Sequence, residues 1–242
     1  MSARIARAMV LAAGLGLRLR PITLTTPKPL VRVGGITMLD RVLDRLAEHG
    51  VELAVVNTHH LGDQIARHVA ARRTPRIEIS HEDVLLDTGG GVAKALPLLG
   101  GTPFFVANSD LLWTDGTEPA LKRLAASWDD ARMDALLLLH PTARAYGYDG
   151  RGDFVADGDG RLARPARGAS APYLFAGVQL LHPRLFAGAP EGRFSLNLLF
   201  DRAAAAGRLF GIVHTGGWYH VGTPDSLAGV EAALAADAAP AR

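Results

Sequence analysis

Glycines and arginines follow the first apolar segment of the chain. Residues 8–13 form a short apolar run that ends at Gly14, which predicts a buried strand, and Gly16, Arg18 and Arg20 come directly after it. Glycines let backbone N–H groups approach an anion closely, and an arginine pairs with phosphate oxygens. The pattern favours a phosphate-binding loop at the end of a strand.

Three common motifs of α/β enzymes are absent from the sequence. The dinucleotide-binding fingerprint needs a third glycine where Leu19 stands, and an acid at the end of the second strand, where Asn57 stands. No Gly-Lys-Ser/Thr triplet occurs, which excludes a P-loop, and no Gly-x-Ser-x-Gly occurs, which excludes the nucleophile of an α/β-hydrolase.

One lysine lies on a stiff segment of the chain. The sequence has 26 basic residues, of which only Lys28, Lys94 and Lys122 are lysines. Lys28 stands between Pro27 and Pro29, and proline fixes the backbone on both sides of it. Two interpretations stay open: a compact positive charge held for a phosphate, or a solvated loop lysine.

A run of three glycines precedes a predicted helix. The run is Asp87-Thr88-Gly89-Gly90-Gly91, and the helix is expected over residues 91–99. Such glycines would expose the N-terminal N–H groups of the helix, which can bind a phosphate or read the edge of a base. A plain helix-entry turn explains the same pattern.

A polar segment follows the apolar run at residues 104–107. It reads Asn108-Ser109-Asp110, so a carboxylate is expected at the end of a buried strand. Magnesium commonly takes one or two protein carboxylates together with the phosphates of a substrate. Asp110 is therefore a candidate magnesium ligand, and an Asx turn is the alternative.

The elements that must position these residues alternate along the first part of the chain. Apolar runs predict strands at residues 8–13, 53–57, 77–80, 104–107 and 135–139, and helical spacing predicts helices at 37–49, 61–71, 91–99 and 121–128. This alternation predicts an α/β fold with a Rossmann-like, mixed but mostly parallel sheet flanked by helices. Ligands bind at the carboxyl ends of such strands.

The pattern changes after residue 146. A hairpin is predicted over 154–162, strands at 174–181 and 218–221, helices at 196–206 and 224–236, and a frayed tail over 237–242. Since no linker is evident, we expect one domain over 1–242. It would have a nucleotide-binding half at 1–140 and a sugar-phosphate-binding half, small and rich in β structure, at 141–236.

Composition excludes several classes of function. The chain has 242 residues, 48% hydrophobic content and a formal net charge of +2, which provides no strong field for nucleic acid or a membrane surface. It has no cysteine, which excludes disulfides and thiolate metal sites. No apolar run is long enough to span a membrane, and the start does not match a signal peptide, so a cytoplasmic protein is expected. The oligomeric state is not predicted.

In combination, the motifs resemble one enzyme family. Leu-x-Ala-Gly-x-Gly-x-Arg-x-Arg-Pro from Leu11, followed by Pro-Lys-Pro-Leu, is similar to the signature of the sugar-1-phosphate nucleotidyltransferases. The resemblance spans almost the whole chain. It implies in-line attack of a sugar 1-phosphate on the α-phosphorus of a nucleoside triphosphate, with release of pyrophosphate and with Mg²⁺ as cofactor.

The resemblance also implies roles for individual residues. Arg18 and Lys28 would contact the triphosphate and, with Asp110 as the magnesium ligand, would form the catalytic set. The nucleotide would be held by Leu11, Ala12, Ala13, Gly14, Gly16, Arg18, Lys28, Thr88 and Gly89. The sugar phosphate would be held by Asn108, Arg151, Gly152, Asp153 and Gly177.

His220 departs from the family pattern. The family usually has an aspartate there as second metal ligand, whereas Mg²⁺ prefers oxygen donors to imidazole. Either one carboxylate suffices, or His220 acts on the metal through water, or another acid substitutes. A histidine at the edge of the core, with no metal role, is a further interpretation.

Four stretches are most similar to the family members that use UTP and N-acetylmuramic acid 1-phosphate in bacterial cell-wall recycling. They are residues 57–62, 87–91, 150–154 and 218–223. That sugar carries a lactyl carboxylate, for which Arg151 is the candidate partner; a solvated loop arginine is the alternative interpretation. The alternatives are glucose, mannose or heptose 1-phosphate, phosphocholine, or a non-catalytic nucleotide-sugar sensor.

Overall fold

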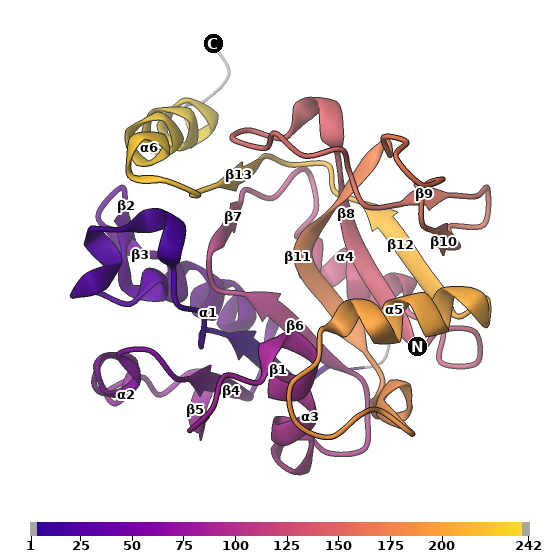
Figure 1. Ribbon diagram of the computed structural model, residues 1–242, viewed down its shortest axis with the longest axis horizontal. Helices are drawn as coiled ribbons and strands as arrows, with labels where there is room; N and C mark the ends of the chain where they lie inside the picture. The colour runs from indigo at the N-terminus through magenta and orange to yellow at the C-terminus, as the bar shows by residue number, and fades with distance from the viewer. Residues whose placement is uncertain (1–3, 239–242) are drawn as a thin grey trace.

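The fold is built on one twisted sheet that takes strands from both halves of the chain (Figure 1). The computed structural model describes residues 4–238. The sheet has seven strands in the order β12-β8-β11-β6-β1-β4-β5. Their bounds are β1 Arg7–Leu11, β4 Leu53–Thr58, β5 Arg76–His81, β6 Phe104–Asn108, β8 Ala135–Pro141, β11 Tyr173–Leu181 and β12 Leu209–Val213.

All neighbouring pairs in this sheet are parallel except those made by β11. Strands β1, β4, β5 and β6 pair in parallel, and β12 pairs in parallel with β8. Strand β11 lies between β6 and β8 and is antiparallel to both. The predicted α/β fold with a mostly parallel sheet is confirmed, and β12 is a strand that the sequence analysis missed.

Helices cover both faces of the sheet. On one face lie α1 (Met38–His49), α2 (Gly62–Val69) and α4 (Ala120–Ser127), and on the other lie α3 (Asp87–Leu99) and α5 (Leu196–Ala205). Each group packs apolar side chains against buried residues of the sheet, as in the contacts of Leu43 and Leu124 on one face and Val92 and Leu199 on the other. The core is therefore two apolar layers separated by the sheet.

The ends of helix α1 were predictable from the sequence because a capping residue stands at each end. Thr37 precedes the first turn, and its hydroxyl accepts a hydrogen bond from the Asp40 N–H at 3.0 Å. Gly50 follows the last turn with φ +90°, a left-handed conformation that glycine adopts without strain. The helix predicted over 37–49 is confirmed with a start one residue later.

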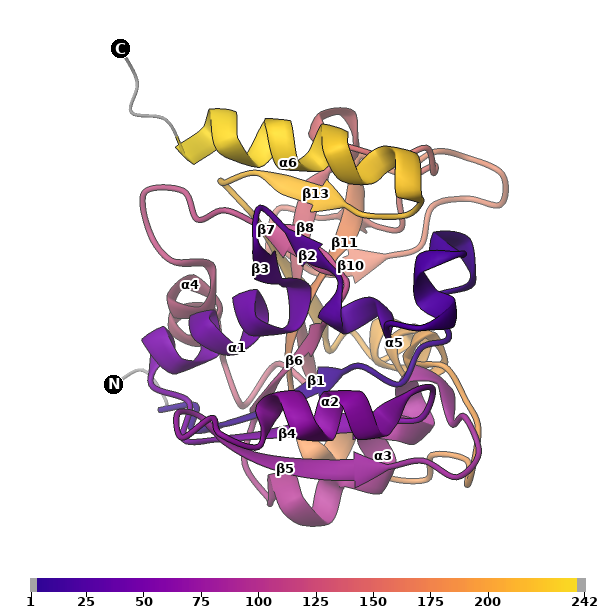
Figure 2. The same cartoon turned by 90° about the vertical axis from the view of Figure 1, so that its left-hand side faces the viewer.

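A smaller layer of structure lies above the sheet, as Figure 2 shows. It comprises the hairpin of β2 (Arg32–Val33) and β3 (Ile36–Thr37), the antiparallel pair β7 (Leu111–Trp113) and β13 (Trp218–His220), and α6 (Pro224–Ala238). A third apolar cluster holds it together. Because α6 continues to Ala238, the tail expected from residue 237 was wrong at 237 and 238. Its remaining residues, 239–242, lie outside the described part of the chain.

The hairpin expected over 154–162 is confirmed by β9 (Val155–Ala156) and β10 (Leu162–Ala163), which pair antiparallel. The turn between them is closed by a hydrogen bond from the Gly160 N–H to the Asp157 carbonyl at 3.1 Å. Gly160 has φ +81°, so a side chain there would be strained. Strand β7 and the β2–β3 hairpin were not predicted, because strands this short carry little periodicity.

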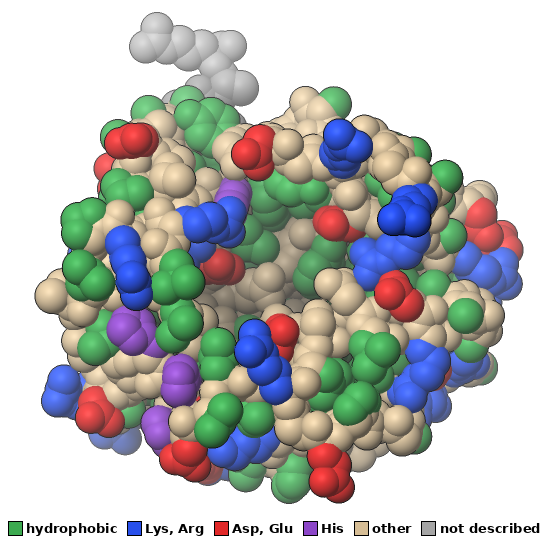
Figure 3. Space-filling view, in the orientation of Figure 1, with side chains coloured by type: hydrophobic (Ala, Val, Ile, Leu, Met, Phe, Trp, Pro, Cys, Tyr) green, Lys and Arg blue, Asp and Glu red, His purple; other side chains and the backbone are tan. Residues whose placement is uncertain are grey.

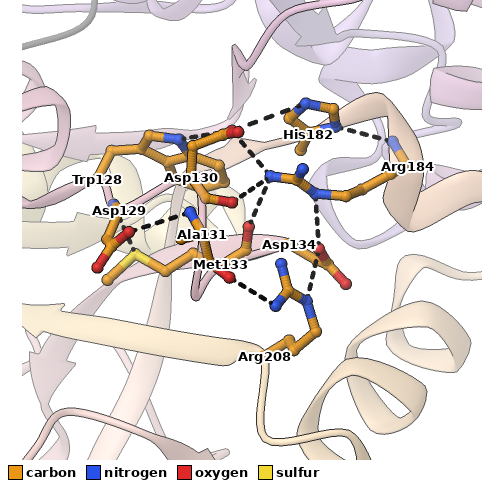
Figure 4. Close-up of polar contacts among 9 residues, drawn as sticks. All are labelled: Trp128, Asp129, Asp130, Ala131, Met133, Asp134, His182, Arg184 and Arg208. Carbon is orange, nitrogen blue, oxygen red and sulfur yellow. Dashed lines mark hydrogen bonds and ion pairs between the residues drawn. The ribbon is translucent and has the colours of Figure 1, made fainter.

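An ionic cluster fixes the edge of the sheet where β8 begins (Figure 4). The Asp134 carboxylate accepts from the Nε atoms of Arg184 and Arg208, each at 2.9 Å. Arg184 also binds Asp130, so the segment before β8 is tied to the turn after β11 and to the start of β12. The cluster lies at the amino ends of β8 and β12, which is the edge opposite to the one where ligands bind.

No helix in residues 4–238 is long and apolar enough to cross a bilayer.

We predict that the folded state loses stability as the pH falls below about 6.5. Burial lowers the pKa of His214, and hydrogen bonds from its Nε2 to the Thr114 and Gly217 carbonyls offset this only in part. The unfolded chain therefore takes up the proton first, so the stability contributed by neutral His214 is complete above that pH and is lost below it.

The test compares the drop in unfolding temperature between pH 7.5 and pH 5.5 for the wild type and for His214→Gln. Glutamine can still donate to the two carbonyls but does not titrate. The drop should be smaller in the variant. Buried His140, whose pKa is also lowered by burial, will keep part of the dependence in both proteins. Equal drops would show that His214 does not contribute.

Candidate functional site

A cleft opens at the carboxyl ends of β1, β4 and β6. Its volume is about 550 Å³, and Figure 3 shows it as the central hollow, with acidic and basic side chains on its walls. It is lined by Leu11, Ala12, Ala13, Gly14, Gly16, Leu17, Arg18, Leu19, Lys28, Pro29, Asn57, Glu82, Leu85, Asp87, Thr88, Asn108, Ser109, Asp110, Arg193 and Gly222.

The glycine loop after β1 forms one wall of the cleft. Gly16 has φ +61°, and a Cβ there would approach the Thr23 methyl carbon to 2.9 Å. The Thr23 hydroxyl donates to the Gly16 carbonyl at 2.8 Å and holds the loop in this shape. Gly14 and Arg18 are exposed toward the cleft, so their N–H and guanidinium groups are accessible to a ligand.

Lys28 and Asp110 meet inside the cleft. The Lys28 Nζ lies 2.9 Å from Asp110 Oδ2, and the exposed fractions of the two side chains are 10% and 38%. Lys28 reaches this position from a short 3-10 turn over Lys28–Leu30, and Asp110 directly follows β6 and Ser109. Segments 82 residues apart are thus joined by a partly buried ion pair, with part of the carboxylate still open to the cleft.

A buried polar network holds the floor of the cleft. Asn57, at the end of β4, accepts from the Ala12 N–H at 2.7 Å and donates to Glu82 Oε1 at 2.7 Å. Glu82 Oε2 accepts from the Leu86 N–H at 2.9 Å, and the Glu82 side chain is almost completely buried. A Cβ at Gly91 would approach both the Asn57 amide nitrogen and Glu82 Oε1 to 2.8 Å. The network therefore requires glycine at that position.

The structure corrects the interpretation of the glycine run. Helix α3 begins at Asp87, so the glycines lie in its first turns and not before it. The N–H groups of Gly89 and Gly90 donate to the Phe194 carbonyl at 2.9 and 3.1 Å. They are not free for a phosphate or a base edge. Glycine is required there because a Cβ at Gly89 would lie 2.3 Å from the Phe194 ring.

Thr88 lines the cleft, and its contact with a nucleotide stays a prediction, whereas Gly89 is buried and lies outside the lining. The Thr88 hydroxyl accepts from the Leu196 N–H at 2.9 Å. Asp87, which the sequence analysis did not select, lines the cleft with φ +62°, and its side chain accepts from the Thr88 N–H at 2.6 Å. A left-handed non-glycine residue is uncommon and often marks a functional segment.

Asn108 and Gly177 are brought together at the far wall. Asn108 ends β6 and lines the cleft, and a Cβ at Gly177 would lie 3.3 Å from its amide nitrogen. Gly177 has φ +81° where the register of β11 against β8 shifts. This irregularity places the backbone of β11 next to the end of β6, so the two predicted sugar-binding residues are neighbours.

Arg151, Gly152 and Asp153 do not line the cleft. The Arg151 guanidinium donates to the Gly168 carbonyl at 3.1 Å, and the Asp153 carboxylate accepts from the Phe175 N–H at 2.8 Å. Gly152, with φ +78°, donates its N–H to the Tyr148 hydroxyl. The segment is therefore attached to β11, and its contact with a sugar stays a prediction.

His220 lies near the ion pair but does not line the cleft. Burial lowers the pKa of His220, and the neighbouring charges of Lys28 and Arg18 lower it further, whereas Asp110 raises it. Its ring stacks on Trp218, with ring centroids 6.1 Å apart. Within residues 4–236, whose side chains the structure describes, no group of three or more His, Cys, Asp or Glu side chains could hold a metal. A metal cage made only of protein groups is therefore absent from this part of the chain.

A metal held by Asp110 together with substrate phosphates fits this donor set. Mg²⁺ usually keeps several waters and takes one or two carboxylates. Asp110 uses Oδ2 for Lys28 and is more than a third exposed, so it retains a hard oxygen donor facing the cleft. The neutral imidazole of His220 suits a contact through water better than direct ligation.

Comparison with known proteins identifies the family to which this chain belongs. The family model described as nucleotidyl transferase matches residues 7–164. The chain belongs to the nucleotidyl transferase family. A relative from Caulobacter vibrioides, named N-acetylmuramate alpha-1-phosphate uridylyltransferase, is 45% identical over 94% of this chain and 96% of its own length. A protein of the same name from Neisseria meningitidis is 35% identical over 90% and 93%.

Solved structures of other nucleotidyltransferases share the fold. The inositol-1-phosphate CTP transferase from T. maritima has a TM-score of 0.78 with 18% identity and covers 98% of both chains. A UDP-glucose pyrophosphorylase complexed with UDP-glucose has a TM-score of 0.75 with 18% identity and covers 96% of this chain and 99% of that one. At this identity the likeness concerns the fold alone.

We predict that Glu82→Gln weakens both the fold and nucleotide binding. The carboxylate accepts two hydrogen bonds, whereas a glutamine presents one amide nitrogen that cannot accept. One buried donor is left unpaired, at a cost of about 1–3 kcal/mol. Unfolding in denaturant and the Kd of a nucleoside triphosphate measure the two effects.

Glu48→Gln, an exposed position on α1, is the matched control and should change neither quantity. If Glu82→Gln kept the wild-type stability and affinity, the network would not be what holds the floor of the cleft.

Proposed function

We propose that this protein transfers UMP from UTP to N-acetylmuramic acid α-1-phosphate and releases pyrophosphate. The observation that carries the proposal is the cleft in which Arg18, Lys28 and Asp110 converge at the carboxyl ends of parallel strands. Family membership supports the reaction type. The names of the Caulobacter and Neisseria relatives, which match over nearly the whole chain, support UTP and the muramic acid sugar.

The chemistry needs positioning more than proton transfer. The attacking group is a phosphate oxygen that already carries negative charge, so no general base is required. The difficulty is the approach of two anions while charge builds on the α-phosphoryl oxygens. Arg18 and Lys28 offset that charge, and the rigid glycine loop orients the triphosphate between them. A bound Mg²⁺ would supply further neutralisation of the triphosphate oxygens.

The two walls of the cleft have separate roles in this proposal. The backbone of residues 11–14 and 16, with Thr88 on the opposite side, holds the nucleotide. Asn108 and Gly177 hold the sugar, and the segment 151–153, attached to β11 through the Phe175 N–H, contributes further contacts to it. The first 140 residues thus bind the nucleotide, and residues 141–236 supply part of the sugar site. With these substrates, we propose that the enzyme acts in peptidoglycan recycling in the bacterial cytoplasm.

Lys28→Ala is expected to lose most activity while the fold stays intact. The lysine is the buried cation at the site proposed for the triphosphate, and loss of one such preorganised charge costs on the order of a hundredfold or more in rate. Pyrophosphate release with UTP and the sugar 1-phosphate measures the effect. Lys122→Ala, on the exposed surface of α4, is the control. Turnover of Lys28→Ala within a few-fold of wild type would rule out the phosphate role.

Asp110→Asn is expected to abolish Mg²⁺-dependent turnover and to leave much of the triphosphate binding. The amide removes the negative charge that attracts the metal, whereas Arg18 and the glycine loop remain. Activity across a Mg²⁺ series and calorimetric titration with the nucleotide measure the two properties. Asp44→Asn on α1 is the control. Full activity together with unchanged Mg²⁺-nucleotide affinity would remove Asp110 from the metal site.

A further inference from the structure

Arg193 is a cation of the cleft that the family signature does not include. It lies on the segment between the short 3-10 turn Pro183–Phe186 and α5, and it lines the cleft beside Thr88. In Figure 1 this segment passes in front of α3 before α5 begins. Its side chain is exposed, and among the side chains described, those of residues 4–236, it makes no ion pair with a carboxylate.

The backbone around Arg193 is held firmly. The Phe194 N–H donates to the Leu86 carbonyl at 3.1 Å, and the Phe194 carbonyl accepts from the first turns of α3. The Leu196 N–H donates to the Thr88 hydroxyl. These bonds fix the residues that follow Arg193 onto the nucleotide wall, so the position from which its guanidinium extends is well defined.

The same segment is also attached to the sugar wall. Phe200 of α5 packs edge-to-face against Phe175 of β11 with ring centroids 6.0 Å apart, and Phe194 belongs to the same apolar cluster. The Phe175 N–H donates to Asp153, and Gly177, two residues further on β11, lies next to Asn108. The residues that follow Arg193 therefore connect the first turns of α3 with the apolar cluster against which Phe175 of β11 packs.

The other two cations that line the cleft already have roles. Lys28 is paired with Asp110, and Arg18 comes two residues after Gly16, where a Cβ would lie 3.1 Å from the Lys28 Cβ. This end of the cleft suits the phosphates. Arg193 is the remaining cation among the lining residues, and its exposed guanidinium is accessible to an anion that is not a phosphate of the reacting pair.

We propose that Arg193 binds the carboxylate of the sugar substrate and selects the lactyl sugar over its neutral counterpart. The inference rests on the proposed function, since the lactyl carboxylate is the one anion of those substrates outside the phosphates. A guanidinium suits it because it binds carboxylates through two parallel hydrogen bonds. Arg193 takes the role that the sequence analysis gave to Arg151, whose guanidinium binds the Gly168 carbonyl outside the cleft lining.

The test is a comparison of two sugars in variants of the full-length enzyme. We would measure kcat/KM with UTP for N-acetylmuramic acid 1-phosphate and for N-acetylglucosamine 1-phosphate, which lacks the lactyl group. Arg193→Ala should lose about tenfold or more on the lactyl sugar, the range expected for a hydrogen bond to a charged group, and at most a few-fold on the other. Arg193→Lys should fall between the alanine variant and wild type on the lactyl sugar.

Arg73→Ala is the matched control, because Arg73 is an exposed arginine near the start of β5, at the sheet edge away from the cleft. It should leave the ratio of the two sugars at the wild-type value. Unfolding temperatures confirm that each variant is folded, and the sugar ratio within one variant does not depend on the fraction of active enzyme. Calorimetric binding of the two UDP-sugars to Arg193→Lys provides a second measurement.

The outcomes separate this inference from the proposed function. Equal losses of Arg193→Ala on both sugars would overturn the carboxylate role. So would a loss confined to the lactyl sugar in Arg151→Ala but absent in Arg193→Ala. A wild-type enzyme that turns over other sugar 1-phosphates but not the lactyl sugar would overturn the proposed substrate and this inference with it.

Discussion

The buried contact between Asn57 and Glu82 is the interaction on which the site depends. Parallel strands bring the ends of β1, β4 and β5 to one edge, where backbone groups emerge from the sheet without partners of their own. Asn57 satisfies the N–H of Ala12, and Glu82 satisfies both Asn57 and the N–H of Leu86. These bonds fix the first residues of the glycine loop relative to the start of α3. The position of any ligand bound between these two segments therefore depends on the same bonds.

Much of the fold and part of the site could be predicted from the sequence. Long elements with a clear period or a cap, such as α1 with Thr37 and Gly50, were predicted to within a residue. Lys28, Asp110 and the glycine loop were selected because charge and glycine stood at predicted strand ends, and the structure places them in one cleft. Strand β12, the short strand β7, the β2–β3 hairpin and the start of α3 carried too little local pattern to be found.

The residues that sequence reasoning missed depend on contacts between distant segments. Asn57 and Glu82 are 25 positions apart. The Phe194 carbonyl, which accepts from the Gly89 and Gly90 N–H groups, comes from the second half of the chain. An anion site at the glycine run remained one interpretation, because the local sequence does not indicate that the Phe194 carbonyl accepts from these N–H groups. Arg193 is one of 23 arginines, and no local sequence pattern marks it as a binding residue. Its position in the lining of the cleft identifies it.

The position of β11 in the sheet sets an order of assembly during synthesis. Strands β8 and β12 are joined to the other strands of the sheet only through β11, because β11 lies between β8 and β6. In a nascent chain that has emerged only as far as β8, one edge of β6 therefore has no partner strand. The apolar strand β8 has no partner strand either. The lining of the cleft includes Arg193 and Gly222, which follow β11 in the chain, so ligand binding reports on a chain whose second half has already folded back onto the first.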